Sequence, residues 1–363
     1  MNASRLLALL AALLLSACDD ADDERIGFAG LADDASQYAQ VLPGRPLIFP
    51  VDHGPHEGFR IEWWYITANL KDDQGTPYGV QWTLFRNALP RRQSVEGEQP
   101  TGWSDRNIWL GHAAVTSRQA HYASERYARG GIGQAGVTFA PFNAWIDDWS
   151  LTSQSAGGDP LATLQLRASD PRFAYQLRLT TDHAPVLQGD NGFSQKSAVG
   201  QASYYYSQPF FQVDGELRID GQPRHVTGTA WLDREWSSQP LTAEQTGWDW
   251  FSLHLANGEQ VMLYRMRNTR GTSYLTGTWI GADGHTEPLR GEDIELTPLS
   301  SAHVAGRDIP VRWSVKVPGK GLDITTEALN PKAWMNLRIP YWEGPITLEG
   351  SQRGTGYLEM TGY

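Results

Sequence analysis

Strict alternation of apolar and polar residues is the feature that most limits how this chain can fold. Residues 78–84, 173–180 and 313–317 place apolar side chains at every second position, which is the period of a β-strand with one buried face. No segment shows a long apolar repeat with the period of an amphipathic helix. Four dipeptides typical of tight hairpin turns separate strand-like segments: Asp214-Gly215, Asp220-Gly221, Asn257-Gly258 and Asp283-Gly284. The chain is therefore predicted to be all-β and antiparallel.

The length of the strand-rich part predicts two barrels. Large meandering sheets close into barrels or pack as sandwiches, because open edges pair with other chains. A lipocalin-sized barrel needs about 150 residues, and residues 45–363 are long enough for two. The polar segment 237–246, which contains Pro240, is the expected seam. We expect two lipocalin-like antiparallel β-barrels in tandem, an N-terminal domain over residues 45–238 and a C-terminal domain over residues 239–363.

The N-terminus has the pattern of a bacterial lipoprotein signal. Arg5 precedes an apolar stretch, residues 6–15, that is too short to span a bilayer. Cys18 follows Leu-Ser-Ala directly and is the only cysteine of the chain, so we expect it to be lipidated. The alternative is an ordinary secreted protein with an incidental cysteine. The pattern predicts a signal peptide over residues 1–17 and an acidic, lipidated tether over residues 18–44.

A lipid anchor at this position predicts a periplasmic protein. By similarity to bacterial lipoproteins, the aspartate that follows Cys18 favours the inner membrane over the outer one. The formal net charge of −11 disfavours binding to nucleic acid. It also disfavours adhesion to anionic lipid, so membrane attachment is expected through the acyl chains.

Several common catalytic patterns are missing from the sequence. It contains no Gly-x-Ser-x-Gly segment and no phosphate-binding glycine loop. His53 and His56, with Asp52 and Glu57 beside them, could supply two metal ligands, but a third is not evident. We interpret these histidines as members of a polar loop, and we predict neither a metal nor a cofactor.

Carboxylates stand beside tryptophan or tyrosine in three short runs, residues 62–65, 231–236 and 248–250. A carboxylate against an aromatic wall is poorly solvated, which raises its pKa and keeps it protonated near neutral pH. The alternative is structural, with core tryptophans whose N–H groups bond to nearby carboxylates. The rings of these runs are candidate ligand-binding residues: Trp63, Trp64, Tyr65, Trp236, Trp248 and Trp250.

Asp233 is the residue that we expect to carry chemistry, if any residue does. It stands two positions after Trp231, so the two side chains share one face of a strand. A tyrosine triplet earlier in the chain sends Tyr204 and Tyr206 to one face and Tyr205 to the other. Two phenols on an interior face would supply both a wall and hydrogen bonds.

Glu62 and Glu235 are predicted to be structural acids. Arg60 and Arg234 are the nearest basic residues in sequence, and tryptophan N–H groups are the alternative partners. Removing one member of a buried ion pair leaves an uncompensated charge, so such acids matter for stability.

Several of these segments resemble the CrtC/AttH group. This group includes carotenoid 1,2-hydratases and AttH-like proteins associated with ABC transport systems. The resemblance runs from about residue 45 to the end of the chain, and it rests on His56 and on residues 62–65, 203–207, 231–236 and 356–363. It implies two lipocalin-like barrels joined end to end.

The hydratases of this group add water to an isolated C=C bond of an isoprenoid without a cofactor. The resemblance implies that a protonated aspartate, here Asp233, supplies the proton, while aromatic faces stabilise the carbocation. Tyr204, Tyr206 and Trp231 stand where the hydratase pattern has histidine, tryptophan and tyrosine, and they are the other candidate catalytic residues. This departure leaves an aromatic cavity with one acid, which suits binding or a different acid-catalysed reaction.

Three functions remain open on these grounds. The first is a lipid-anchored periplasmic protein that binds a hydrophobic small molecule, of isoprenoid or polyketide type, and serves an ABC export system. The second is a cofactor-free hydro-lyase or isomerase with Asp233 as the proton donor. The third is a structural envelope protein with filled barrels. A cavity that reaches Asp233 favours the first two functions, and a filled core favours the third.

Overall fold

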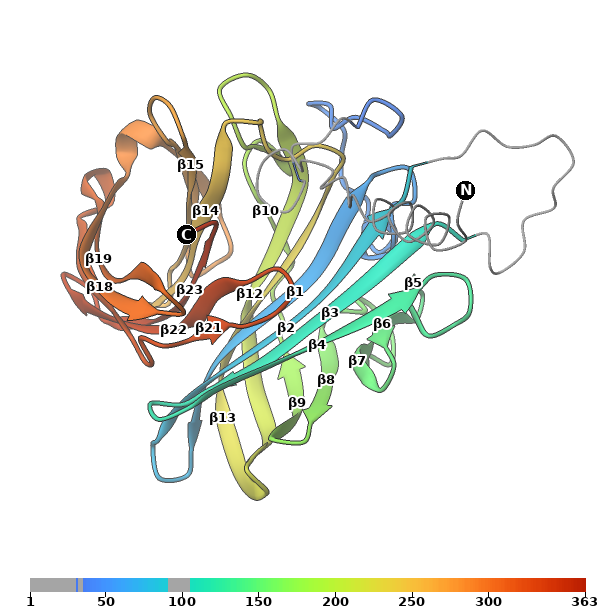
Figure 1. Cartoon of the computed structure of the whole chain (residues 1–363), viewed down its shortest axis with the longest axis horizontal. Helices are drawn as coiled ribbons and strands as arrows, with labels where there is room; N and C mark the ends of the chain where they lie inside the picture. Colours follow the sequence, from blue (N-terminus) through green and yellow to red (C-terminus); the bar gives the residue numbers. More distant parts are fainter. Residues whose placement is uncertain (1–30, 32–34, 91–104) are drawn as a thin grey trace, which may run out of the picture.

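The computed structural model describes residues 31, 35–90 and 105–363, whose strands form two antiparallel sheets (Figure 1). Both sheets are strongly curved, one into a nearly closed barrel and the other into a half-barrel. The prediction of an all-β chain with two lipocalin-like units is therefore confirmed. The described residues contain no α-helix, only the short 3₁₀ turns η2 (Val51–His53), η4 (Gly291–Asp293) and η5 (Pro318–Lys320). Among these residues, no helix is long and apolar enough to cross a membrane.

The first sheet has thirteen strands in the order β4-β3-β2-β1-β13-β12-β9-β8-β7-β6-β5, with β10 and β11 paired to β12. Its strands are β1 (Ile61–Asp72), β2 (Pro77–Ala88), β3 (Asn107–Thr116), β4 (His121–Arg129), β5 (Ala135–Phe139), β6 (Phe142–Ile146), β7 (Trp149–Ser153), β8 (Thr163–Asp170), β9 (Phe173–Thr180), β10 (Val186–Leu187), β11 (Phe193–Gln195), β12 (Ala202–Ile219) and β13 (Gln222–Ser237). Because β1 pairs with both β2 and β13, the strands β12, β13, β1, β2 and β3 form one continuous surface.

The second sheet has ten strands in the order β17-β16-β15-β14-β23-β22-β20-β19-β18, with β21 paired to β22. Its strands are β14 (Gln245–Leu255), β15 (Gln260–Asn268), β16 (Tyr274–Ile280), β17 (Thr286–Arg290), β18 (Glu295–Val304), β19 (Arg307–Val317), β20 (Leu322–Ala328), β21 (Trp334–Met335), β22 (Tyr341–Gly350) and β23 (Gly354–Thr361). The first and last strands, β14 and β23, are neighbours here as well. Each sheet therefore brings the two ends of its own segment together.

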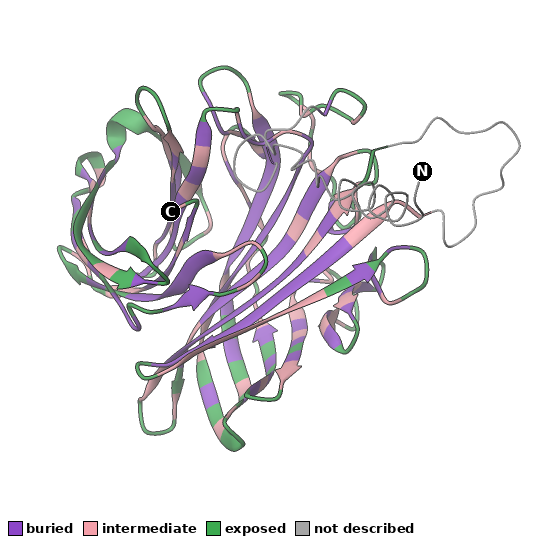
Figure 2. Cartoon of the chain, in the orientation of Figure 1, coloured by how far each residue is buried: buried purple, intermediate pink, exposed green. Residues whose placement is uncertain are grey.

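Side chains of β1 alternate between two environments. Trp64, Ile66 and Ala68 point into the core of the first sheet, where each is at most 1% exposed. Trp63 and Tyr65 point the other way and pack in an apolar cluster shared with the second sheet. The first sheet therefore has two buried faces, one toward its own core and one toward the second sheet. Figure 2 shows this burial along the parts of the long strands that lie beside the second sheet.

The cluster between the sheets is mainly aromatic. The first sheet contributes Tyr65, Tyr205 and Trp231, and the second contributes Trp250, Met262, Tyr264, Met266 and Tyr357. At Gly79 of β2 the sheets approach so closely that an added Cβ would lie 2.6 Å from Pro345 Cδ of β22. A glycine at this place lets the two surfaces meet without a collision.

Three of the four predicted hairpin turns are confirmed. Asp220-Gly221 connects β12 to β13, Asn257-Gly258 connects β14 to β15, and Asp283-Gly284 connects β16 to β17. The turn predicted at Asp214-Gly215 is wrong, because these residues lie inside β12. An added Cβ on Gly215 would lie 2.2 Å from the carbonyl oxygen of Gln176 in β9, so this glycine permits two strands to approach each other.

The predicted signal peptide, Cys18 and most of the acidic tether lie outside the described residues. Residues 35–44, the expected end of that tether, are hydrogen-bonded to the first sheet. The Tyr38 hydroxyl donates to the Ala88 carbonyl at 2.8 Å, and the Leu42 N–H donates to the Tyr204 hydroxyl at 3.0 Å. For residues 35–44 the prediction of a tether is therefore wrong, because polar groups of these residues find partners on the sheet, whereas residues 18–30 and 32–34 lie outside the described residues.

Candidate functional site

Five neighbouring strands of the first sheet present two rows of side chains to the second sheet. Residues directly opposite each other on antiparallel strands point to the same face. One row crosses β12, β13, β1, β2 and β3 at Ser207, Asp233, Tyr65, Thr83 and His112. The adjacent row crosses the same strands at Tyr205, Glu235, Trp63, Phe85 and Leu110. All of these side chains except Ser207 line one cavity.

The second sheet closes this cavity from the other side. Strands β14, β15, β22 and β23 contribute Trp248, Trp250, Tyr264, Met266, Tyr341, Glu359 and Thr361. Leu31, Pro240 and Leu241 also line the cavity, whose volume is about 150 Å³. We name this space the inter-sheet cavity. Four of the six rings predicted to bind a ligand line it: Trp63, Tyr65, Trp248 and Trp250.

Asp233 reaches the inter-sheet cavity from β13 and accepts three hydrogen bonds. The Tyr205 hydroxyl donates to Oδ2 at 2.5 Å, while the Ser207 hydroxyl and the Trp231 N–H donate to Oδ1 at 2.5 and 2.6 Å. Burial raises the pKa of Asp233 to about 7, although these hydrogen bonds act in the opposite direction. Asp233 therefore exchanges its proton near neutral pH.

The direction of these hydrogen bonds is fixed by a further layer of donors. Gln188 Nε2 donates to the Ser207 hydroxyl at 2.7 Å, and Trp250 Nε1 donates to the Tyr205 hydroxyl at 3.2 Å. Both hydroxyls therefore direct their own protons at Asp233. Two donors occupy Oδ1 and only one occupies Oδ2, so Oδ2 is the oxygen with room for a proton.

Glu235, two residues further along β13, has a different environment. It lies 2.9 Å from Lys196 Nζ and accepts a hydrogen bond from the Ser203 hydroxyl. Lys196 also lies over the rings of Tyr205 and Tyr264, at 4.8 and 4.3 Å from their centres. The sequence predicts arginine or a tryptophan N–H group as the partner of Glu235. In the structure the partner is Lys196, from the segment before β12.

The second sheet brings two more buried acids to this region. Glu343 and Glu359 stand directly opposite each other on β22 and β23, an arrangement that disfavours two negative charges. Burial, followed by the charge of Glu359, raises the pKa of Glu343 well above its usual range, while Tyr65 donates a hydrogen bond to it. Burial also raises the pKa of Glu359 to about 7, and Trp248 Nε1 donates to it at 2.6 Å.

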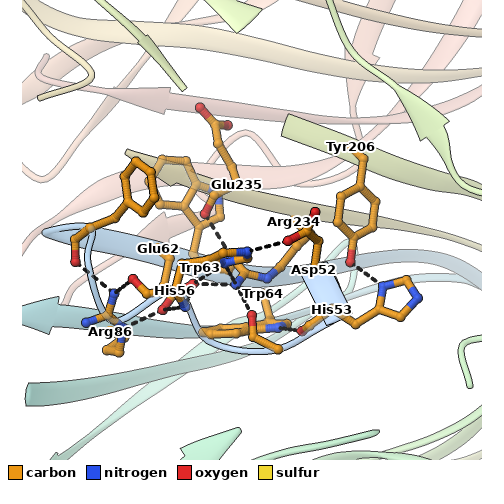
Figure 3. A network of polar contacts seen from close by, with 12 residues as sticks. Asp52, His53, His56, Glu62, Trp63, Trp64, Arg86, Tyr206, Arg234 and Glu235 are labelled. Atoms are coloured by element: carbon orange, nitrogen blue, oxygen red, sulfur yellow. Dashed lines mark hydrogen bonds and ion pairs between the residues drawn. The ribbon is translucent and has the colours of Figure 1, made fainter. Parts of the chain in front are cut away.

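Glu62, by contrast, lies on the opposite face of the first sheet, inside its core. It forms ion pairs with Arg86 and Arg234 (Figure 3). Burial alone would raise the pKa of Glu62, but the charges of Arg234 and Arg86 outweigh it and hold the pKa well below its usual range. Arg60, the other candidate partner, donates from Nε to the Ser238 carbonyl at 2.7 Å instead. Of the two arginines that the sequence predicts as partners, Glu62 therefore pairs with Arg234, and Arg86 is its second partner.

The third run, residues 248–250, also divides its side chains between two faces of a strand. Trp248 and Trp250 line the inter-sheet cavity, whereas Asp249 points into the second sheet. There Asp249 pairs with Arg265 at 2.7 Å and with Arg267 at 2.6 Å. The acid and the two rings of this run therefore serve opposite faces of β14.

Four residues expected at the site lie in the core of the first sheet instead: Tyr204, Tyr206, Trp64 and Trp236. Tyr204 and Tyr206 pair in register with Trp236 and Arg234, not with Asp233. The prediction that these two tyrosines share a cavity with Asp233 is wrong, because residues one position apart on a strand face opposite sides. Tyr205, between them, is the tyrosine that reaches Asp233.

The two histidines considered as metal ligands belong to a polar loop beside the first core. The ring of His56 bridges Asp52 and Glu62, at 3.0 Å from Nε2 and 3.1 Å from Nδ1. His53 Nδ1 lies 2.7 Å from the Tyr206 hydroxyl (Figure 3). Within residues 35–90 and 105–363, no group of three or more His, Cys, Asp or Glu side chains is placed to hold a metal ion.

Two curved sheets of this order, with an aromatic cavity between them, define a tandem lipocalin-like protein. The chain belongs to the AttH-like family, whose model matches residues 40–363. The resemblance to the CrtC/AttH group is thereby confirmed. Among curated proteins, none matches this sequence.

Three solved structures share the fold over most of the chain. An AttH protein from Nitrosomonas europaea is 32% identical, with a TM-score of 0.78, over 90% of this chain and 99% of its own. Kievitone hydratase from Nectria haematococca is 16% identical, with a TM-score of 0.66, over 90% and 96%. CghA, solved with Sch210972, is 14% identical, with a TM-score of 0.52, over 91% and 97%. The last two similarities concern the fold alone.

Proposed function

We propose that this protein binds an apolar small molecule of isoprenoid or polyketide type in the inter-sheet cavity and transfers a proton to one of its C=C bonds. The observation that carries the proposal is Asp233, a buried acid in an aromatic cavity with a pKa of about 7. A general acid works best when its pKa lies near the working pH. A hydratase is among the proteins that share this fold.

The proposed reaction starts at Asp233 Oδ2. Its O–H bond breaks as a C–H bond forms on the alkene, and Tyr205, Ser207 and Trp231 stabilise the carboxylate that remains. The carbocation lies against aromatic faces of the cavity, such as that of Trp250. Water then adds to the cation and its proton returns to Asp233, or the carboxylate removes a neighbouring C–H proton and the double bond moves. Both endings regenerate the acid.

Deuterium incorporation tests this reaction even while the substrate is unidentified. The protein is incubated in D₂O with a lipid extract of its host, and products are examined by mass spectrometry for deuterium bound to carbon. Asp233→Asn keeps the shape of the side chain, so we expect it to bind the same compound and to lose about 10²–10⁴-fold in rate. Equal incorporation by wild type and Asp233→Asn would contradict the assignment.

A binding protein without catalysis is the second candidate. The observation in its favour is that Asp233 already accepts three hydrogen bonds, so its polar atoms are satisfied without a substrate. In that case wild type returns the bound compound without deuterium, and Asp233→Asn changes its affinity only modestly. A purely structural role has less support. Both sheets have filled cores, but the inter-sheet cavity reaches Asp233.

We further propose that lipidation of Cys18 holds the protein at the periplasmic face of the inner membrane, where the bound molecule would pass to an ABC export system. The support is the signal pattern that ends at Cys18 and the aspartate after it. Cys18→Ser should move the protein from the membrane fraction to the soluble periplasmic fraction. Continued sedimentation of this variant with membranes would contradict the anchor.

A further inference from the structure

His112 of β3 forms the end of the inter-sheet cavity that lies away from Asp233. The row that crosses the first sheet runs from Asp233 through Tyr65 and Thr83 to His112. Neighbouring strands lie about 4.8 Å apart, so the backbones of Asp233 and His112 are separated by about 14 Å. Both side chains line the cavity, which makes them its two polar ends along this row.

One ring nitrogen of His112 is unused. Nδ1 lies 2.9 Å from the Tyr341 hydroxyl, whereas Nε2 has no hydrogen-bond partner among the described residues. The residue is only 2% exposed, and burial lowers its pKa to about 3, so the ring is neutral. Buried polar groups of native proteins are nearly always paired. An unpartnered nitrogen in the wall of a cavity therefore points to a ligand group.

The surroundings of His112 determine the chemistry of that group. The nearby acids Glu343 and Glu359 raise the pKa of the Tyr341 hydroxyl, after the larger effect of burial. The partly ionised Glu359 disfavours an anionic group, and the neutral ring of His112 offers such a group no positive charge. A neutral imidazole offers a cation no charge, and it forms one hydrogen bond through Nε2 with a hydroxyl or a carbonyl.

We infer that His112 binds a hydroxyl or carbonyl group at one end of the ligand. The ligand is then an elongated, largely apolar molecule with its polar end at His112 and the C=C bond that Asp233 protonates toward its other end. Phe85, Leu110 and Met266 add apolar surface to the wall of the same cavity. This inference rests on the proposed function and deepens it by naming the substrate class.

Two probes that differ in one hydroxyl test this inference: farnesol and the hydrocarbon farnesene. Their affinities are measured by quenching of the fluorescence of the cavity tryptophans in wild type and in His112→Phe, which keeps an aromatic ring. Comparing the farnesol-to-farnesene affinity ratio between the two proteins cancels the different solubilities of the probes. We expect the ratio to fall up to about tenfold in His112→Phe, with farnesene binding retained.

Leu110→Ala is the matched control, since Leu110 lines the cavity on the same strand and its apolar side chain forms no hydrogen bond. It should weaken both probes by a similar factor and leave their ratio unchanged. An unchanged ratio in a folded His112→Phe protein would overturn the inference and leave the proton transfer by Asp233 standing. A ratio that falls in His112→Phe, together with no deuterium transfer by wild type, would support the inference and overturn the catalysis. Failure of both probes to bind wild type would overturn the inference and the proposed ligand class together.

Discussion

Glu62 and Asp233 are both buried acids beside tryptophan, on neighbouring strands of one sheet, yet their pKa values move in opposite directions. Glu62 is 0% exposed and Asp233 3% exposed. The pKa of Glu62 is held well below its usual range, after two arginines outweigh the effect of burial. The pKa of Asp233 rises to about 7, and in the described part of the chain no lysine or arginine forms an ion pair with it.

The difference teaches that the compensating charge, and not burial, decides the state of each acid. Glu62 faces the core of the first sheet together with Arg86 and Arg234. Asp233 faces the inter-sheet cavity, where its partners are the neutral donors Tyr205, Ser207 and Trp231 in hydrogen bonds. Neutral donors stabilise a carboxylate less than an adjacent cation does. The first sheet thus holds an acid with compensating cations on its core face and an acid without one on its cavity face.

Glu62→Gln should produce the largest effect. The change removes the negative charge and leaves the buried side chains of Arg86 and Arg234 uncompensated, which costs about 5 kcal/mol of the free energy of unfolding. Chemical denaturation at neutral pH measures this loss. Asp233→Asn is the matched control, because it removes an acid without stranding a cation, and it should cost far less. Equal losses in the two variants would break the contrast between the faces.

Glu235→Gln should cost less, about 3 kcal/mol of the free energy of unfolding, because it leaves the single buried cation Lys196 without its partner. The double variant Lys196→Met with Glu235→Gln should recover much of the loss, since the unpaired charge is gone. Thermal and chemical denaturation of the two proteins give the comparison. If Glu235→Gln is as stable as wild type, the ion pair with Lys196 does not stabilise the fold. Glu235 would then resemble Asp233, an acid of the cavity, rather than Glu62.

The sequence predicted the fold because alternation and turn chemistry act locally. Residues two apart share a face, so alternation alone places Trp231 and Asp233 together, as the structure has them. The choice between Tyr204 and Tyr205 cannot be made in this way. Both faces of β12 are buried, and its pairing with β13 contains an irregularity between Gln208 and Phe211, so apolar character does not mark the face that meets the cavity.

Other residues of the site come from strands far apart in the sequence. Glu359 reaches the cavity because β23 pairs with β14, directly opposite Trp250. His112 joins the row of Asp233 only through the registers of β1, β2 and β3. Long-range pairings of this kind follow from how two sheets close and pack, which a local pattern does not encode. A lone acid or histidine on an alternating strand gives no signal by itself.

The pH dependence of stability sharpens the comparison further. The native pKa of Asp233 lies above its unfolded value near 4, so the native state holds a proton that the unfolded chain has released. Stability is therefore lost as pH rises from about 4 through about 7, whereas the lowered pKa of Glu62 makes stability fall toward acid pH. Between about pH 5 and about pH 8, the free energy of unfolding of Asp233→Asn should fall by about 2 kcal/mol less than that of wild type. Urea titrations at each pH measure the free energy of unfolding of both proteins. If the two values fall in parallel with pH, the raised pKa belongs to another group, for example Glu359.

The smallest expected effect is a shift in the pKa of Asp233, and it compares a tyrosine on the cavity face of β12 with one on the core face. Tyr205→Phe removes the hydroxyl that donates to Asp233 Oδ2, and a hydrogen bond to the ionised form holds a carboxyl pKa down. The pKa of Asp233 should therefore rise by about one unit, seen as a shift in the pH at which the infrared band of its protonated carboxyl disappears. Tyr204→Phe is the matched control, because its hydroxyl bonds to Leu42 on the core side and its loss should not move that band. If both variants shift the band equally, the faces are coupled through the sheet and Asp233 is not tuned by its own donors.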